Sequence, residues 1–153
     1  MIVPDINLLL YAYDSDSPFQ AKAAAWWQAC LAGDEPVLLP EVVVFGFIRI
    51  STNARAFHHP MTAVESIAHV RSWLEQPPVR LADTAPDHAE RVLALIAALG
   101  TAGNLMTDVQ IAAVAMANDA VLYTADADFL RFKGLRWRNP LTGDAPARRR
   151  QGR

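Results

Sequence analysis

The sequence predicts an α/β fold in which helices cover both faces of a central, mainly parallel sheet of four or five strands. Short apolar runs bounded by turn residues alternate with longer segments of helical periodicity along the whole chain. Strands that alternate with helices form parallel sheets buried between helix layers. The length of 153 residues and the hydrophobic content of 52% suit one compact domain with a substantial core.

The first half of the chain predicts two strands and three helices. The strands are expected at 2–3 and 37–39, and the helices at 7–13, 18–32 and 40–53. Ser17 is a preferred helix cap, and Pro18 suits a first helical position because proline has no N–H to leave unpaired. Gly33 is expected to end the second helix, because glycine often terminates helices.

The second half continues the alternation after a loop at 53–60. Thr62 is expected to cap a helix that ends before Pro77-Pro78, since proline interrupts helices. Further helices are expected at 86–99, closed by Gly100, and at 104–118, and strands at 79–81, 120–124 and 135–137. The last of these would be the fifth strand.

Charge is distributed unevenly along the chain. Four of the 14 basic residues, Arg148, Arg149, Arg150 and Arg153, lie in the last six positions, so the rest holds ten basic against 16 acidic residues. We expect a single domain at 1–140 and a basic, disordered tail at 141–153. An acidic body is unlike a general nucleic-acid-coating protein, but it fits a site that gathers carboxylates around a cation.

The chain carries no feature of secretion or of membrane insertion. Cys30 is the only cysteine, which excludes an intrachain disulfide and suggests a buried thiol. The N-terminus lacks the charged and cleavage regions of a signal peptide, and no apolar run is long enough to cross a bilayer. A reducing, cytoplasmic location is the expectation, with no membrane partner.

Acidic residues follow three of the expected strands, at the point where each of these strands ends. Asp5 follows the first strand, Glu41 the second, and Asp126 and Asp128 the 120–124 strand, while Asp108 lies near the start of the preceding helix. Ligands of open parallel sheets bind outside the carboxyl ends of the strands. If these strands are neighbours, the carboxylates converge.

Converging carboxylates raise one another's pKa, because like charges cannot easily ionise together. A divalent cation removes that cost, and Mg²⁺ prefers a few carboxylate oxygens with water and phosphate. The pattern therefore predicts hydrolysis or transfer at phosphorus. Each acid also has a purely structural interpretation, as a helix cap, a first-turn charge or a turn residue.

Four segments, in chain order, resemble the motifs of PIN-domain proteins, and most closely those of VapC-type toxins. The first has Asp5 and Asn7 in a DxN pattern after the first strand. The others are Pro40-Glu41 with Arg49 downstream, Asn104 through Asp108 leading an alanine-rich helix, and Thr124-Ala-Asp126-Ala-Asp128-Phe129. Together they span Met1 to about Pro140. Val109 departs from the pattern, where alanine is common.

The resemblance implies a three-layer α/β/α sandwich and an Mg²⁺-dependent ribonuclease, in which Mn²⁺ can substitute and water is the nucleophile. It also implies a homodimer that a VapB-like antitoxin silences. The family's acidic quartet falls on Asp5, Glu41, Asp108 and Asp126, and Asp128 matches a more variable position.

Roles for these residues follow as a hypothesis. Asp5, Asp108 and Asp126 are expected to hold the principal metal, and Glu41 to bind a second metal or to orient the attacking water. Donors that aim the carboxylates are expected among Asn7, Asn104 and Thr124. Arg49 contacts a phosphate or forms a structural salt bridge, two interpretations that the sequence leaves open.

Three other functions compete with this one. A non-catalytic PIN module would bind RNA or a partner protein, although the complete acidic set favours catalysis. A haloacid-dehalogenase-type phosphatase usually has a second aspartate where Asn7 stands. That phosphatase and a receiver-like domain both need a well-placed lysine, and the chain has only Lys22 and Lys133.

Overall fold

A computed structural model describes residues 1–145 and contains a parallel sheet of five strands in the order β3-β2-β1-β4-β5. The strands are β1 Ile2–Pro4, β2 Val37–Leu39, β3 Val79–Leu81, β4 Val121–Tyr123 and β5 Trp137–Arg138. All four strand pairings are parallel. The prediction of a parallel sheet is therefore confirmed, and the fifth strand lies two residues later than the expected start at 135.

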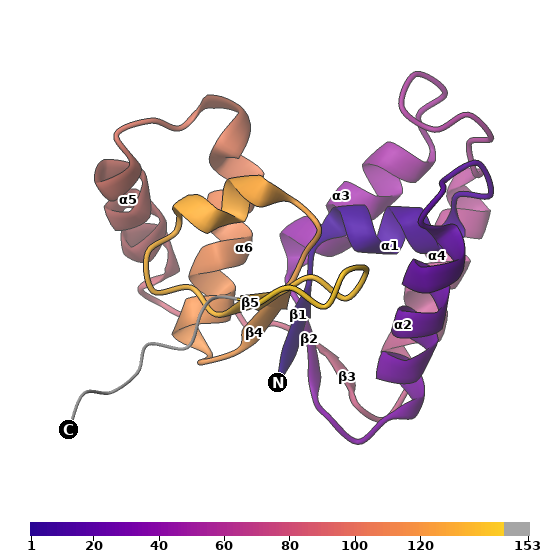
Figure 1. The fold of residues 1–153 in the computed structure, drawn as a ribbon, viewed down its shortest axis with the longest axis horizontal. Coiled ribbons are helices and arrows are strands. Elements are labelled where there is room, and N and C mark those ends of the chain that lie inside the picture. Colours follow the sequence, from indigo (N-terminus) through magenta and orange to yellow (C-terminus); the bar gives the residue numbers. More distant parts are fainter. Residues whose placement is uncertain (146–153) are drawn as a thin grey trace.

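Helices cover the sheet on both sides. They are α1 Ile6–Tyr13, α2 Gln20–Ala32, α3 Glu41–Ser51, α4 Ala63–Leu74, α5 His88–Leu99 and α6 Met106–Ala117, with 3₁₀ turns η1 Gly103–Leu105 and η2 Ala127–Arg131. Figure 1 shows α1 to α4 gathered on one side of the sheet and α5 and α6 on the other. This is the α/β/α sandwich that the alternation predicts.

The core on the α1–α4 side is built around large aromatic side chains. Trp27, Phe47 and Trp73 are fully buried, and the Trp73 ring meets the other two at centroid distances of 5.5 and 4.8 Å. The Trp73 indole N–H donates to the Tyr13 hydroxyl at 2.7 Å. These contacts join α1, α2, α3 and α4 into one body that supports the sheet edge.

Several helix boundaries follow the predicted signals, and others do not. Thr62 forms a capping box with Glu65, and Gly100 closes α5 in the left-handed conformation at φ 72°, as expected. The helix expected from Pro18 begins only at Gln20, because the Ser17 hydroxyl accepts the Phe19 N–H at 3.1 Å in a local turn. The helices expected from 86 and 104 likewise start two residues late, the second after a 3₁₀ turn.

The described residues continue past Pro140, where the sequence predicts that the domain ends and a basic tail begins. Leu141 is buried in the core, and its N–H donates to the Asn139 side-chain oxygen at 2.9 Å. The Lys22 ammonium donates to the Leu141 carbonyl at 3.3 Å. The four tail arginines lie outside the described residues. No helix within residues 1–145 is long and apolar enough to span a membrane.

Candidate metal centre

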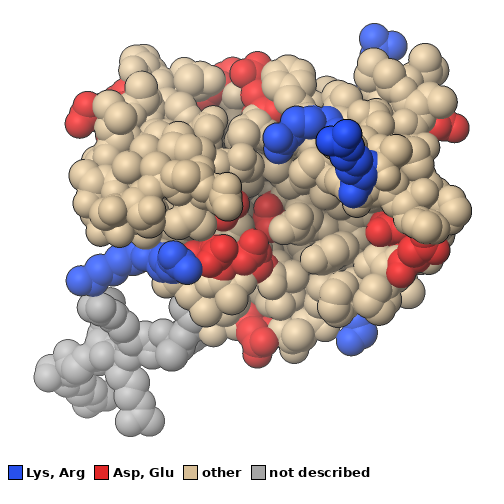
Figure 2. All heavy atoms as spheres, turned by 90° about the horizontal axis from the view of Figure 1, so that it is seen from above, with Lys and Arg blue, Asp and Glu red and all other residues tan. Residues whose placement is uncertain are grey.

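The strand order brings three acidic positions to adjacent strand ends. β1 lies between β2 and β4, so Asp5 stands between Glu41, which follows β2, and Asp126, which follows β4. The pairing of Pro4 with Tyr123 puts Asp5 and Thr124 side by side, and the Asp5 N–H donates to the Tyr123 carbonyl at 2.9 Å. Figure 2, seen from above the carboxyl ends of the strands, shows acidic side chains gathered in a hollow with basic side chains on either side.

Three aspartates form the tightest part of this site, which we call the acidic cluster. Asp108, Asp126 and Asp128 each offer a carboxylate oxygen within 4.8 Å of the others. Asp108 comes from the first turn of α6, and the other two come from the turn after β4. The Asp128 N–H donates to Asp126 Oδ1 at 2.8 Å, which sets the direction of the Asp126 carboxylate.

Asp5 is almost completely buried, and its carboxylate is not among the three of the acidic cluster, although the charges of Asp108 and Asp126 act on it. The Thr124 hydroxyl donates to Asp5 Oδ2 at 2.9 Å, and its oxygen accepts the Asp126 N–H at the same distance. One side chain therefore connects the ends of β1 and β4 and orients two of the acids. This contact is the kind that the sequence analysis expected of Thr124.

The electrostatics of the site favour a bound cation. Burial, together with the charges of Asp108 and Asp126, raises the pKa of Asp5 to about 7. Burial raises the pKa of Asp108 to about 6, with contributions from Asp126 and Asp128. Two carboxylates that resist ionisation, with two further aspartates beside them, form a donor set that a divalent cation fits, since the cation stabilises the charged forms.

Glu41 lies apart from the acidic cluster. It is exposed at the start of α3 and lines a cavity of about 180 Å³ with Asp83, His88 and Gln110. The structure therefore places Glu41 at the expected strand end, but its carboxylate is not among the three that lie within 4.8 Å of one another. Its part in the site stays a prediction.

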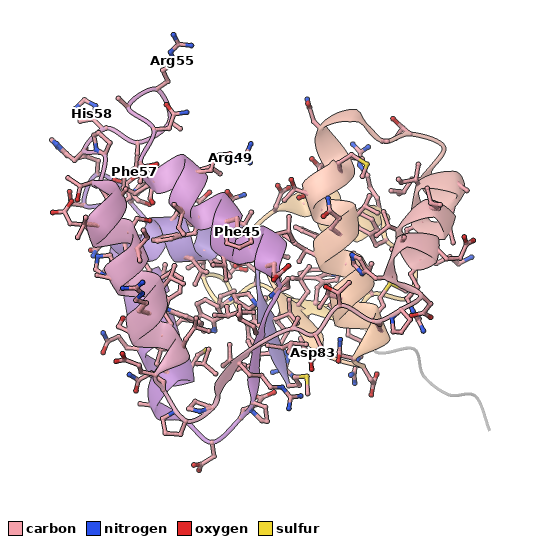
Figure 3. All side chains as sticks on the ribbon, turned by 180° about the vertical axis from the view of Figure 1, so that it is seen from behind. Phe45, Arg49, Arg55, Phe57, His58 and Asp83 are labelled. Carbon is pink, nitrogen blue, oxygen red and sulfur yellow. The ribbon has the colours of Figure 1, made fainter. Side chains whose placement is uncertain are left out.

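The remaining predicted residues make no direct bond to the acids within residues 1–145. Asn7 is half-buried on α1 and Asn104 is exposed in η1, and among residues 1–145 neither side chain has a hydrogen bond to the acids. Arg49 is exposed in the last turn of α3, and the described part of the chain shows no salt bridge for it. Figure 3 shows Arg49 and Phe45 about one turn apart on α3, with the Arg49 side chain extending away from the helix.

Sequence reasoning missed two neighbours of the acids. Burial and then the charges of Asp5 and Asp126 raise the pKa of Tyr11, so its hydroxyl lies within the electrostatic influence of these two acids. Tyr11 lies four residues after Asn7, and that helical spacing could have identified it. Arg131 pairs with Asp128 at 3.2 Å, again at a helical spacing, of three residues.

A family model and the most similar curated proteins both point to the same family. The model of the PIN domain matches residues 2–135. "Ribonuclease VapC33" of Mycobacterium tuberculosis is 45% identical over 92% of this chain and 99% of its own length. "VapC ribonuclease Mb2897" of Mycobacterium bovis is 34% identical over 94% of this chain and 97% of its own.

Solved structures agree on the fold. A crystal structure of VapBC2 from Rickettsia felis, bound to a DNA fragment from its promoter, has a TM-score of 0.67 at 17% identity, over 91% of this chain and 98% of that chain. Mycobacterium tuberculosis VapC20, described as a sarcin-ricin loop cleaving toxin, has a TM-score of 0.65 at 16% identity, over 85% of this chain and 93% of that chain.

Proposed function

Because this chain belongs to the PIN-domain family, we propose that it is a metal-dependent ribonuclease and the toxin of a type II toxin–antitoxin system. Its near full-length relatives bear the names of VapC ribonucleases at 31–45% identity. The observation that carries the proposal is the acidic cluster together with the buried Asp5, because this donor set suits a divalent cation used in phosphodiester hydrolysis.

The proposed cofactor is Mg²⁺, with Mn²⁺ able to substitute, held by Asp5, Asp108 and Asp126. When bound, such an ion lowers the pKa of water and neutralises charge on the phosphate. Oxygen donors of this kind are those that hard cations select. Asp128 is the third member of the acidic cluster, and its ion pair with Arg131 balances part of its charge.

The chain's own residues would orient the reaction. Thr124 holds Asp5 in one orientation, so Asp5 presents its free oxygen without a search among rotamers. In hydrolysis a water oxygen bonds to phosphorus and gives up a proton, the bond from phosphorus to the ribose oxygen breaks, and that oxygen takes up a proton. We assign to Glu41 the positioning of this water, and to Arg49 a contact with a neighbouring phosphate.

The proposed partners are RNA as substrate, a second copy of the chain in a homodimer, and a VapB-like antitoxin. A toxin–antitoxin complex from Klebsiella pneumoniae has the same fold, which supports an antitoxin for this chain. The activity would be exerted in the cytoplasm, where RNA substrates are found.

Cleavage of a structured total-RNA pool by the antitoxin-free protein tests the function. With Mg²⁺ or Mn²⁺ we expect discrete fragments, and with EDTA none. Asp108→Asn should reduce cleavage by at least ~100-fold, because it removes a charge from the acidic cluster. Asp34→Asn is the matched control, since Asp34 is exposed in the turn before β2, at the other end of the sheet.

Undiminished cleavage by Asp108→Asn would refute the assigned site. Folded protein that cleaves no RNA under any metal condition would instead indicate a non-catalytic PIN module that binds RNA or a partner.

A further inference from the structure

A second group of metal-binding side chains lies at the far end of α3. Asp16, His58 and His59 each offer one ligand atom, and these three atoms lie within 4.8 Å of one another. We call these residues the histidine cluster. His59 Nε2 lies 3.4 Å from Asp16 Oδ2, and the two imidazole rings are 4.9 Å apart and nearly perpendicular. All three side chains are exposed, so an ion can reach them from solvent.

The histidine cluster joins two loops that are distant in sequence. Asp16 lies between α1 and α2, and the histidines lie between α3 and α4. Because α3 has 11 residues, which span about 16 Å, the cluster is well separated from Glu41 at the other end of that helix. Figure 3 shows His58 on the loop beyond α3, away from Asp83.

Both loops are held in place by contacts that do not involve the three side chains. The Asp16 N–H donates to Asp14 Oδ1 at 3.0 Å, which fixes the turn that carries Asp16. The residue before His58 is Phe57, whose ring is buried in the core. The Met61 N–H donates to the Ser51 carbonyl at 2.8 Å and closes the second loop. The backbone therefore keeps the three residues close to one another before any ion binds.

We propose that the histidine cluster is a second metal site, selective for an imidazole-binding divalent transition metal such as Zn²⁺ or Ni²⁺. Imidazole nitrogen suits these ions, whereas the all-oxygen acidic cluster suits Mg²⁺ and Mn²⁺. Three protein ligands leave at least one coordination position open to water. A bound ion would tie the loop after α1 to the loop after α3. Of the two helices that these loops follow, α1 begins beside Asp5 and α3 begins at Glu41.

Calorimetric titration of Ni²⁺ into the full chain tests the proposal, with the protein prepared without a polyhistidine tag and kept in excess Mg²⁺ so that the acidic cluster is already filled. We expect one ion per chain, with the affinity falling about tenfold or more in His58→Ala and in His59→Ala. His88→Ala is the matched control, because it removes an imidazole outside the cluster. Asp108→Asn separates the two sites, since it alters only the acidic cluster. Both of these variants should bind Ni²⁺ like the parent.

A spectroscopic measurement gives a second readout that does not depend on stability. Paramagnetic Ni²⁺ should broaden the imidazole resonances of His58 and His59, and leave that of His88 sharp. If His59→Ala keeps the parent affinity, or if Asp108→Asn abolishes binding, the site is wrong. In that case the 3.4 Å contact is only a surface ion pair between His59 and Asp16.

Discussion

Asp5 combines burial, a hydrogen bond and two charged neighbours, and its protonation links the site to folding. Its folded-state pKa of about 7 exceeds the ordinary value of 3.8, chiefly because of burial. The folded protein therefore binds a proton there that the unfolded chain releases at lower pH. The stability that this group contributes is complete below about pH 4, and is lost as the pH rises towards about 7.

This linkage predicts the behaviour of Asp5→Asn, which keeps the shape of the side chain but cannot ionise. In EDTA, the parent should lose a few kcal/mol of unfolding free energy relative to Asp5→Asn between about pH 4 and pH 7. Urea denaturation at both ends of this range measures the difference. Mg²⁺ should restore stability to the parent at neutral pH, because an ion that binds the charged site favours the folded state. A constant difference between the two proteins across the range would contradict the shifted pKa.

Thr124 is predicted to act as a positioning residue for Asp5 and Asp126. Thr124→Val removes both hydrogen bonds, so the pKa of Asp5 should rise further, and cleavage should fall about tenfold. The loss of stability should be about 1 kcal/mol. NMR titration of Asp5 and the cleavage rate report the two effects. Thr124→Ser keeps the hydroxyl and should restore both, which a purely structural role for the methyl group would not explain.

At the scale of the elements, the close packing of α1 on α3 positions the helices that begin beside Asp5 and at Glu41. Gly46 of α3 faces Ile6 of α1, and a Cβ at Gly46 would crowd the end of the Ile6 side chain and lie 3.3 Å from Ile6 Cγ1. This contact shows why the helix tolerates a glycine in its interior, where glycine is otherwise unfavourable.

Gly46→Ala is therefore expected to reduce the free energy of unfolding by about 1–2 kcal/mol, because the added methyl overpacks a buried contact. Ile6→Val shortens the opposing side chain, so the double variant should lose less stability than the two single changes together. A denaturation cycle of the four proteins measures the coupling. If the effects of the two changes on the free energy of unfolding are strictly additive, Gly46 and Ile6 are not coupled, and the prediction is wrong.

At the scale of the whole molecule, the segment after β5 packs back onto α2 through Leu141 and Lys22. Leu141→Ala should cost about 2 kcal/mol of unfolding free energy, because it leaves a space in the core. Leu93→Ala is the matched control, since Leu93 is 59% exposed and its truncation should change stability little. Equal small effects for both leucines would support a domain boundary at 140.

Much of this architecture could be predicted because its signals are local. Alternating apolar runs and helical periodicity identify the parallel sheet, and Thr62 and Gly100 mark helix ends through contacts with near neighbours. The acids that follow β1, β2 and β4 could also be located, because the end of a strand is signalled by the residues next to it in the sequence. The signals at Ser17 and Pro18 placed the start of α2 two residues too early. The reason is that a serine side chain can close a turn as well as cap a helix.

The arrangement of the site depends on contacts between segments that lie far apart in the chain. Local pattern could not show that β1 lies between β2 and β4, that Thr124 bonds to Asp5 across 119 positions, or that Glu41 stands apart from the three clustered aspartates. Local pattern also could not show that Asp16 lies beside His59, or that Leu141 is buried. Residue types and spacing specify which groups follow each strand. Their distances and pKa values arise only when packing sets the strand order and excludes water.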